Sequence, residues 1–157
     1  MSKATRATKM LEQAGIDFTL HAYAYDPGSD KVGLQAAAAL GEPADRVLKT
    51  LMLLLDGKPV CAIVPSDREV SLKKLASALG GKHAEMMKPV DAERVTGFKV
   101  GGISPFGQKR RVPTIMEQAA LSQALVYING GQRGLQVRLN PADALHLLGA
   151  EAVDVVQ

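Results

Sequence analysis

The sequence predicts an α/β fold in which a mixed β-sheet is flanked by helices. The chain has 157 residues, of which 46% are hydrophobic, so it is long enough for one domain with a substantial core. Helix-type and strand-type patterns alternate irregularly along it, and several strand pairs are joined by hairpin-type turns. Because hairpins join antiparallel strands, a purely parallel sheet is excluded. No repeat or linker-like segment divides the chain, and we expect a single domain over residues 1–157.

The chain begins with a predicted helix and a predicted strand. Residues 3–14 favour a helix, with Ser2 as its N-cap and Gly15 ending it in the left-handed conformation. Residues 17–24 follow as a strand, because apolar and polar side chains alternate there with a period of two. The alanine-rich residues 34–40 then favour a second helix.

A β-hairpin is the clearest element of the sequence. Residues 47–64 contain two apolar runs around the pair Asp56-Gly57, which is the strongest short-range hairpin signal. Before the hairpin, Gly41 ends the second helix and Pro43 suits the first turn of a short helix. The other expected elements are a helix over 71–79 stopped by Gly80 and Gly81, a helix over 90–96 after Pro89, strands over 124–129 and 135–139, a helix over 141–148 and a short strand near Val153.

The composition excludes several classes of protein. The 19 Lys and Arg residues only slightly outnumber the 16 Asp and Glu residues, so positive charge matters only where it clusters. The apolar runs are shorter than the roughly 20 residues of a membrane-spanning helix, and no signal core is visible near the start, so we expect a cytoplasmic protein. One cysteine and three scattered histidines match no metal-ligand spacing, and we expect neither a metal nor a cofactor.

Lys49 is a cation within an apolar strand. Strand alternation places it on the same face as Leu51, Leu53 and Leu55. In one interpretation it begins the strand and extends its ammonium to water along an apolar stem. In the other it faces a cleft as a partly buried cation that binds phosphate or stabilises a developing oxyanion. Periodicity alone does not separate the two.

The stretch GGISPFGQKRR, residues 101–111, places glycines before a cluster of cations. It matches neither the Walker loop nor the dinucleotide-binding fingerprint, which argues against nucleotide hydrolysis. Gly101 and Gly102 permit a ligand to approach the backbone amides, and Ser104 offers a hydroxyl. Pro105 stiffens the turn. The alternative interpretation is an ordinary turn.

Four cations accompany two glycine-rich turns. Lys109, Arg110 and Arg111 end the first stretch, and Arg133 lies in the second turn, NGGQRG. Cations beside such turns suggest contact with a phosphate backbone, whereas the alternative is a solvated run of charge. With only two or three phosphates neutralised, the binding would be weak and would depend strongly on salt.

No protein nucleophile is predicted. Cys61 lies within VCAIV, where a small apolar side chain in a buried strand is expected. His21, His83 and His146 share no spacing with a serine or an aspartate that would indicate a hydrolytic triad.

Three stretches resemble the YbaK family of aminoacyl-tRNA deacylases, and the resemblance covers nearly the whole chain. These stretches are VLKTL, VGGISPFGQKRRVPT and YINGGQRGLQV. The Lys-Thr pair and the glycine-rich loop are similar to the free-standing cysteinyl-tRNA(Pro) deacylase branch more than to its alanine-editing relatives. The resemblance implies a small α/β domain with a mixed, partly barrel-like sheet and flanking helices, and a role in translation fidelity through trans-editing of mischarged tRNA.

The resemblance also implies roles for individual residues. Lys49 matches the essential lysine, and Tyr23 matches a tyrosine at the pocket. The residues expected to line the pocket or to contact the acceptor end are Gly101, Gly102, Ser104, Asn129, Gly130, Gly131, Lys109, Arg110, Arg111 and Arg133. Relatives commonly have Ser where this chain has Asn129, and Asp where it has Gln136. Asparagine still donates and accepts hydrogen bonds, but the missing carboxylate leaves open any role of Gln136 as a base or charge partner.

The mechanism implied by the resemblance needs no protein nucleophile. The cysteine thiol of the substrate attacks its own ester carbonyl and expels the tRNA hydroxyl, while Lys49 and the loop amides position the acceptor end and offset charge on oxygen. The expected substrate is cysteinyl-tRNA(Pro), with cysteinyl-tRNA(Cys) as a further candidate, and prolyl-tRNA synthetase is the expected partner. Two alternatives remain: a deacylase for alanyl- or seryl-tRNA, and a non-catalytic module that binds tRNA or a synthetase.

Overall fold

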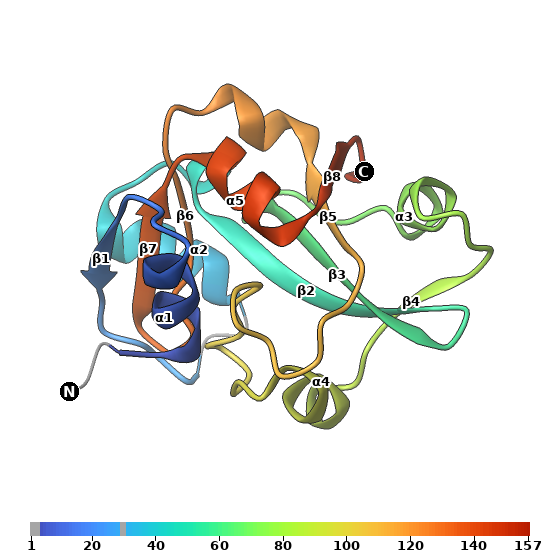
Figure 1. Cartoon of the computed structure of the whole chain (residues 1–157), viewed down its shortest axis with the longest axis horizontal. Coiled ribbons are helices and arrows are strands. Elements are labelled where there is room, and N and C mark those ends of the chain that lie inside the picture. Colours follow the sequence, from blue (N-terminus) through green and yellow to red (C-terminus); the bar gives the residue numbers. More distant parts are fainter. Residues whose placement is uncertain (1–3, 29–30) are drawn as a thin grey trace.

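The computed structural model describes residues 4–28 and 31–157, which form two β-sheets with helices packed around them (Figure 1). The smaller sheet has the strand order β1-β7-β6, and the larger has the order β4-β2-β3-β5-β8. β5 runs parallel to β3 and to β8, whereas the other strand pairs of the described residues are antiparallel, so the predicted mixed α/β architecture is confirmed. The sheets meet at a parallel bridge between Val47 and Tyr127, and they do not close into a barrel within the described ranges.

The smaller sheet has one helix on each face. Its elements are β1 (Phe18–Ala22), β6 (Val126–Asn129) and β7 (Leu135–Leu139), with the helices α1 (Arg6–Gln13) and α2 (Val32–Leu40). Ile128 and Val137 are opposite each other in the ladder and share a core cluster with Ala7 of α1. Tyr127 points to the other face because side chains alternate along a strand, and it packs against Ala36 of α2.

The larger sheet is built around the predicted hairpin. Its strands are β2 (Leu48–Leu55), β3 (Lys58–Pro65), β4 (Ala84–Met86), β5 (Thr114–Glu117) and β8 (Glu151–Val153). Asp56 and Gly57 have φ angles of 50° and 81°, as a type I′ turn requires at both central positions. β2 and β3 then pair from Leu55 with Lys58 to Leu48 with Pro65, which confirms the hairpin. Asp56 is the one non-glycine residue with positive φ among those described.

The remaining helices are short and begin at recognisable caps. They are η1 (Ala44–Arg46), α3 (Leu72–Ala78), α4 (Pro89–Thr96), η2 (Gln118–Ser122) and α5 (Pro141–Leu148). Ser71 Oγ accepts the N–H of Lys74 at the start of α3, and Asn140 Oδ1 accepts the N–H of Ala142 at the start of α5. Within the described ranges, no helix has the length and apolarity needed to cross a membrane.

Several predicted boundaries were wrong. The first helix begins at Arg6 and not at residue 3, because Thr5 forms a reciprocal capping box with Thr8; the proposed cap, Ser2, lies outside the described residues. The first strand spans only Phe18–Ala22, and α4 includes Pro89, which suits the first helical turn. The strands β4 and β5 and the short helix η2 were not predicted.

Candidate functional site

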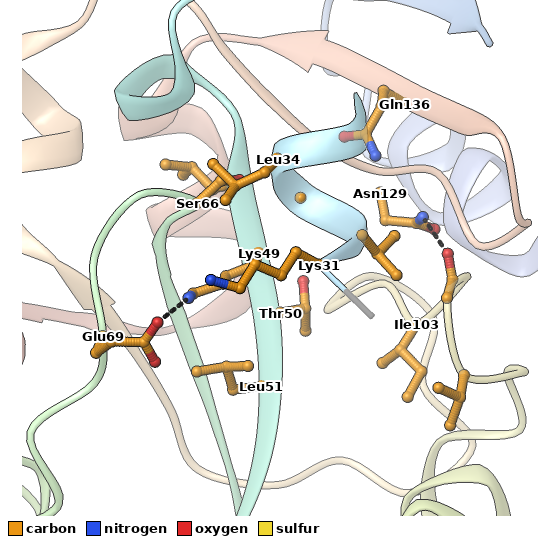
Figure 2. Close-up of a pocket in the computed structure, with 15 residues that line it drawn as sticks. Lys31, Leu34, Lys49, Thr50, Leu51, Ser66, Glu69, Ile103, Asn129 and Gln136 are labelled. Atoms are coloured by element: carbon orange, nitrogen blue, oxygen red, sulfur yellow. Dashed lines mark hydrogen bonds and ion pairs between the residues drawn. The ribbon is translucent and has the colours of Figure 1, made fainter. Parts of the chain in front are cut away.

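A cavity of about 420 Å³ lies where the start of β2 meets the smaller sheet (Figure 2). This volume is within the range of small-molecule sites. Several parts of the chain supply its walls: the first turn of α2, the strand β2, the segment after β3, the loop at residues 100–103, and the end of β6 with the start of β7. The lining residues are Lys31, Val32, Gly33, Leu34, Leu48, Lys49, Thr50, Leu51, Ser66, Glu69, Val100, Gly101, Ile103, Asn129 and Gln136.

Strand pairing explains why two amides share this cavity. Asn129 of β6 and Gln136 of β7 are direct partners in the antiparallel ladder, so their side chains emerge on the same face of the smaller sheet. That face also carries Tyr127 and is the one covered by α2. Asn129 and Gln136 are buried, with 7% and 3% of their surface exposed.

Lys49 lies in the wall of the cavity with its ammonium paired to Glu69. Its Nζ is 3.6 Å from Glu69 Oε1, and the lysine side chain is 21% exposed whereas that of Glu69 is 73% exposed. Figure 2 shows Lys49 pointing toward Glu69, with Asn129 and Gln136 across the cavity. The lysine side chain is therefore largely buried, and its ammonium lies at the cavity. A role in binding phosphate or stabilising an oxyanion stays a prediction.

The start of α2 adds further positive potential. Val32, Gly33 and Leu34 of its first turn line the cavity, and the N-cap residue Lys31 gives them no side-chain cap. The first N–H groups of a helix have no partner within the helix, and the helix dipole places partial positive charge there. Together with Lys49, this wall favours an anionic group or an oxygen that gains negative charge.

The two predicted glycine-rich turns are held together by Asn129. Its Oδ1 accepts the N–H of Gly131 at 2.7 Å, and its Nδ2 donates to Gly101 O at 3.3 Å. Gly101 has a φ of 91°, and a Cβ there would collide with the Tyr25 hydroxyl. A Cβ at Gly102 would lie 2.7 Å from the backbone nitrogen of Arg133, so the two turns are in backbone contact and glycine is required at both positions.

Arg133 braces the same loop. Its Nε donates to Val100 O at 2.8 Å, and its guanidinium carbon lies 5.4 Å from the centre of the Tyr25 ring. The carbonyl of Val100 is therefore fixed beside the cavity by a planar donor that also makes a cation–π contact. This position ties Arg133 to the protein, whereas the sequence suggested contact with a phosphate.

Three buried side-chain oxygens have no hydrogen-bond partner within the described residues: Thr50 Oγ1, Gln136 Oε1 and Tyr23 Oη. Thr50 and Gln136 line the cavity. Tyr23 is not in the lining; it packs against the cluster of α2 and Tyr127, and burial raises the pKa of its hydroxyl, an effect that the nearby Gln136 partly offsets. An unpaired buried polar atom costs free energy, and such atoms beside a cavity are available to a ligand.

The structure places the other predicted residues away from the cavity lining. Ser104 is fully buried, and its Oγ accepts the N–H of Phe106 at 3.1 Å. Gly130 closes the second turn through an N–H bond to Leu135 O at 2.8 Å. Lys109, Arg110 and Arg111 are exposed and lie beside the end of α4. The backbone N–H groups of Lys109 and Arg110 donate to carbonyls at the end of that helix.

Cys61 is part of the core. It is fully buried, and desolvation raises the pKa of its thiol to about 12, so the thiol is neutral at physiological pH. His83 and His146 are exposed, and the ring centroids of His21 and Tyr127 are 5.2 Å apart. The described residues contain no group of three His, Cys, Asp or Glu side chains that could hold a metal ion.

Sequence analysis missed several residues of the cavity. Gly33 packs so closely on Ser66 that a Cβ would collide with the serine hydroxyl, which itself donates to Val47 O. Glu69 lies twenty positions after Lys49 in the sequence, in the segment that follows β3. Gly33, beside the predicted alanine-rich helix, was the one local sequence signal for this part of the cavity. Nothing in the sequence around Ser66 or Glu69 indicates a cavity.

Comparison with known proteins now assigns the chain to a family. The model of the aminoacyl-tRNA editing domain matches residues 27–147. The chain belongs to the aminoacyl-tRNA editing domain family. The predicted resemblance to YbaK deacylases is thereby confirmed. Residues of the cavity from Lys31 to Gln136 all lie within the matched range.

Individual editing-domain relatives agree with this assignment. EbsC of Enterococcus faecalis, a proposed Cys-tRNA(Pro)/Cys-tRNA(Cys) deacylase, is 33% identical over 96% of this chain and 92% of EbsC. A proline–tRNA ligase of Nitratidesulfovibrio vulgaris is 41% identical over 52% of this chain but only 14% of that enzyme. The crystal structure of a proposed trans-editing enzyme for prolyl-tRNA synthetase superposes with a TM-score of 0.83 at 24% identity, covering 100% of this chain and 98% of that one, and shows the same fold.

Proposed function

We propose that this protein is a trans-editing deacylase that releases cysteine from mischarged cysteinyl-tRNA(Pro). The observation that carries the proposal is the cavity, in which Lys49 and the first turn of α2 face the glycine turns joined by Asn129. Membership of the editing-domain family and the 33% identity to EbsC support this substrate class. The cavity is of the right size for an aminoacyl group together with part of the terminal nucleotide.

The chemistry of the lining supports a reaction driven by the substrate. The described lining contains no cysteine and no histidine, and its serine, Ser66, already donates its hydroxyl to Val47 O. The hydroxyl of Thr50 has no hydrogen-bond partner among the described residues, so no base is paired with it. In the proposed reaction the substrate sulfur forms a bond to its ester carbonyl carbon, and the bond from that carbon to the ribose oxygen breaks. The thiol proton passes to the leaving ribose oxygen. The products are tRNA with a free terminal hydroxyl and a cysteine thiolactone, which water then opens to cysteine.

Lys49 and the loop amides would act on charge and position in this reaction. As the sulfur attacks, negative charge develops on the carbonyl oxygen, and a nearby ammonium and backbone N–H groups stabilise it. Holding the thiol against the ester converts the attack into a preorganised intramolecular step. Gln136 Oε1 and Thr50 Oγ1, which lack partners in the described structure, are available for polar atoms of the aminoacyl group.

The direct test measures cysteine release from cysteinyl-tRNA(Pro) by the full chain and by Lys49→Ala. We expect the variant to lose at least about 100-fold in rate, in line with removal of an oxyanion-stabilising group, while uncharged tRNA still binds. Lys74→Ala is the matched control, because Lys74 is also paired to a carboxylate, at 2.9 Å from Asp154, but does not line the cavity. Retained tRNA binding without any release by the unaltered protein would instead support a non-catalytic module.

A further inference from the structure

A second hollow lies at the far end of β2, where the hairpin turns. It has a volume of about 330 Å³ and is formed by the hairpin end, the segment after α3 and the segment before β5. We call it the hairpin groove. Its lining residues are Leu55, Asp56, Lys58, Pro59, Val60, Leu79, Gly80, Gly81, Arg110, Arg111, Val112 and Pro113.

The hairpin groove has an excess of positive charge. Lys58, Arg110 and Arg111 line it, and none of the three has a carboxylate within 4.0 Å among the described residues. The one carboxylate of the lining, Asp56, accepts the backbone N–H groups of Lys82 and His83 at 3.0 and 2.9 Å. Both carboxylate oxygens of Asp56 therefore already accept backbone N–H groups, and the groove has three positive side chains against this one negative side chain.

The groove and the Lys49 cavity are at opposite ends of one strand. Lys49 lines the cavity and Leu55 lines the groove, and both belong to β2. A strand advances about 3.3 Å per residue, so the two sites are about 20 Å apart along β2. Figure 1 shows β2 running from the neighbourhood of α2 to the hairpin end near β4.

We propose that the hairpin groove binds the phosphate backbone of the tRNA acceptor stem while the aminoacylated end occupies the Lys49 cavity. This inference rests on the proposed function. By the spacing of about 3.4 Å per nucleotide along one strand of duplex DNA, about 20 Å corresponds to about six nucleotides inward from the terminal one. Arginine and lysine are the side chains that bind phosphate oxygens, and Arg110 and Arg111 are free of carboxylate partners within the described chain.

The composition of the groove favours RNA over a protein surface. Its lining has no aromatic side chain, whereas the buried centres of protein interfaces are enriched in aromatic residues. Unpaired cations around a shallow hollow are instead typical of contact with a phosphate backbone. An acidic protein surface is the competing partner, and the experiment below separates the two.

The test compares two variants of equal charge in the full chain. The groove variant combines Lys58→Gln, Arg110→Gln and Arg111→Gln. A first readout is the dissociation constant for uncharged tRNA, measured at two salt concentrations, which does not depend on deacylation. Contact with three phosphates steepens the slope of log affinity against log salt concentration by about 2.7. Between about 50 and 200 mM salt, this slope corresponds to a loss of about 40-fold in affinity. We expect the groove variant to lose this part of the dependence and to bind more than about 10-fold more weakly at the lower salt.

The control variant removes three exposed cations outside the groove: Lys9→Gln, Lys73→Gln and Lys88→Gln. It should keep the salt dependence of the unaltered protein, and thermal unfolding of both variants checks that they fold. Equal affinity and equal salt dependence for the groove and control variants would overturn the proposal and leave an acidic protein surface as the candidate partner.

A second readout separates this proposal from the proposed function. The groove variant should deacylate a cysteinylated CCA trinucleotide as fast as the unaltered protein, because that fragment is too short to reach the groove, while its KM for full-length cysteinyl-tRNA(Pro) rises. Equal losses on both substrates would contradict the proposal. If the unaltered protein releases cysteine from neither substrate, the proposed function fails, and the binding of uncharged tRNA still decides the role of the groove.

Discussion

Asn129 joins the two glycine-rich turns of the candidate site, because its Nδ2 donates to the carbonyl of Gly101 at 3.3 Å. Its Oδ1 accepts the N–H of Gly131 at 2.7 Å, so one side chain uses both ends of its amide. The loop that carries Gly101 and the turn that carries Gly131 are thereby fixed relative to each other and to β6. The shape of the cavity depends on this residue.

Removal of this connection should impair both stability and activity. Asn129→Ala leaves the partly buried N–H of Gly131 and carbonyl of Gly101 without this partner, and we expect a loss of about 1–3 kcal/mol in the free energy of unfolding. Because the loop also loses its position, deacylation should fall by more than 10-fold, an estimate of about 1.4 kcal/mol in transition-state stabilisation. Denaturant unfolding and single-turnover deacylation measure the two effects.

Asn140→Ala is the matched control for this change. Asn140 caps α5 by accepting the N–H of Ala142 at 2.8 Å, and α5 does not line the cavity. Loss of this cap should cost about 1 kcal/mol of stability and leave deacylation unchanged. Similar losses of activity in the two variants would show that Asn129 acts only through stability.

The ion pair between Lys49 and Glu69 should restrain the lysine in the absence of substrate. Glu69 is 73% exposed, so Glu69→Gln should change the free energy of unfolding by less than about 1 kcal/mol. Freed from its partner, Lys49 is available to the substrate, and we expect KM for charged tRNA to fall about two- to fivefold. Asp154→Asn, which breaks the exposed pair with Lys74, is the control and should leave KM unchanged. A higher KM in Glu69→Gln would mean that Glu69 holds Lys49 in its productive position.

Arg133 should support activity by holding the loop at Val100 in place, and not by binding a phosphate of the tRNA. Arg133→Lys retains the charge but loses the planar Nε donor to Val100 O and the contact with Tyr25. We expect this variant to lose about 10-fold in kcat, comparable to one charge-assisted hydrogen bond, with no change in the salt dependence of tRNA binding. The outcome against this account is normal kcat in Arg133→Lys together with a weaker salt dependence in Arg133→Gln, because that pair of results indicates a phosphate contact.

Cys61 should be dispensable for catalysis. Burial raises the pKa of its thiol to about 12, so at pH 7–8 almost none of it is thiolate, and the folded protein should not react with a thiol reagent. Cys61→Ala removes one buried atom and should cost about 1 kcal/mol of stability while deacylation continues at the normal rate. Loss of activity without loss of folding in this variant would point to a protein nucleophile.

Asp56 should make the stability of the hairpin depend on pH. The backbone N–H groups of Lys82 and His83 lower the pKa of its carboxyl below the ordinary value. A depressed native pKa contributes stability above the unfolded value of about 3.9, and this contribution is lost as pH falls through the native pKa. Asp56→Asn should therefore unfold at a lower temperature than the unaltered protein at pH 7, with the difference shrinking below about pH 4.

Asp67→Asn provides the comparison for this pH effect, because the Asp67 side chain is exposed and makes no hydrogen bond among the described residues. Thermal unfolding followed at pH 7 and at pH 3 measures both variants. A difference between Asp56→Asn and the unaltered protein that persists unchanged at pH 3 would assign the effect to the turn geometry and not to the charge.

Local patterns in the sequence predicted much of the fold. The pair Asp56-Gly57 determines the hairpin because both positions need positive φ, and Ser71 and Pro141 mark helix starts for reasons that lie within a few residues. The strands β4 and β5 were missed because each is only three or four residues long and depends on partners far along the chain. Glu117 of β5, for example, is buried and accepts the N–H of Val155 at 3.0 Å, which no local pattern indicates.

The candidate site was predicted only in part. Alternation along β2 drew attention to Lys49, the glycine-rich loop to Gly101, and the family resemblance to Asn129. The structure brings these three residues to one cavity. Glu69 and the first turn of α2 enter that cavity through tertiary packing, so their sequence neighbours carry no signal. The contact of Lys109, Arg110 and Arg111 with the acceptor end stays a prediction. The backbone N–H groups of Lys109 and Arg110 donate to carbonyls at the end of α4, and none of the three residues lines the cavity.

The measurement that tests the central claim most directly compares the release of cysteine and of 2-aminobutyrate from tRNA(Pro) by the same preparation. The two aminoacyl groups have similar size, but 2-aminobutyrate carries a methyl group where cysteine carries its thiol. Thiol-driven release predicts rapid loss of cysteine, dependence on Lys49, and no loss of 2-aminobutyrate above the rate in buffer. Equal release of the two amino acids would contradict the account, because water or a protein group would then be the nucleophile.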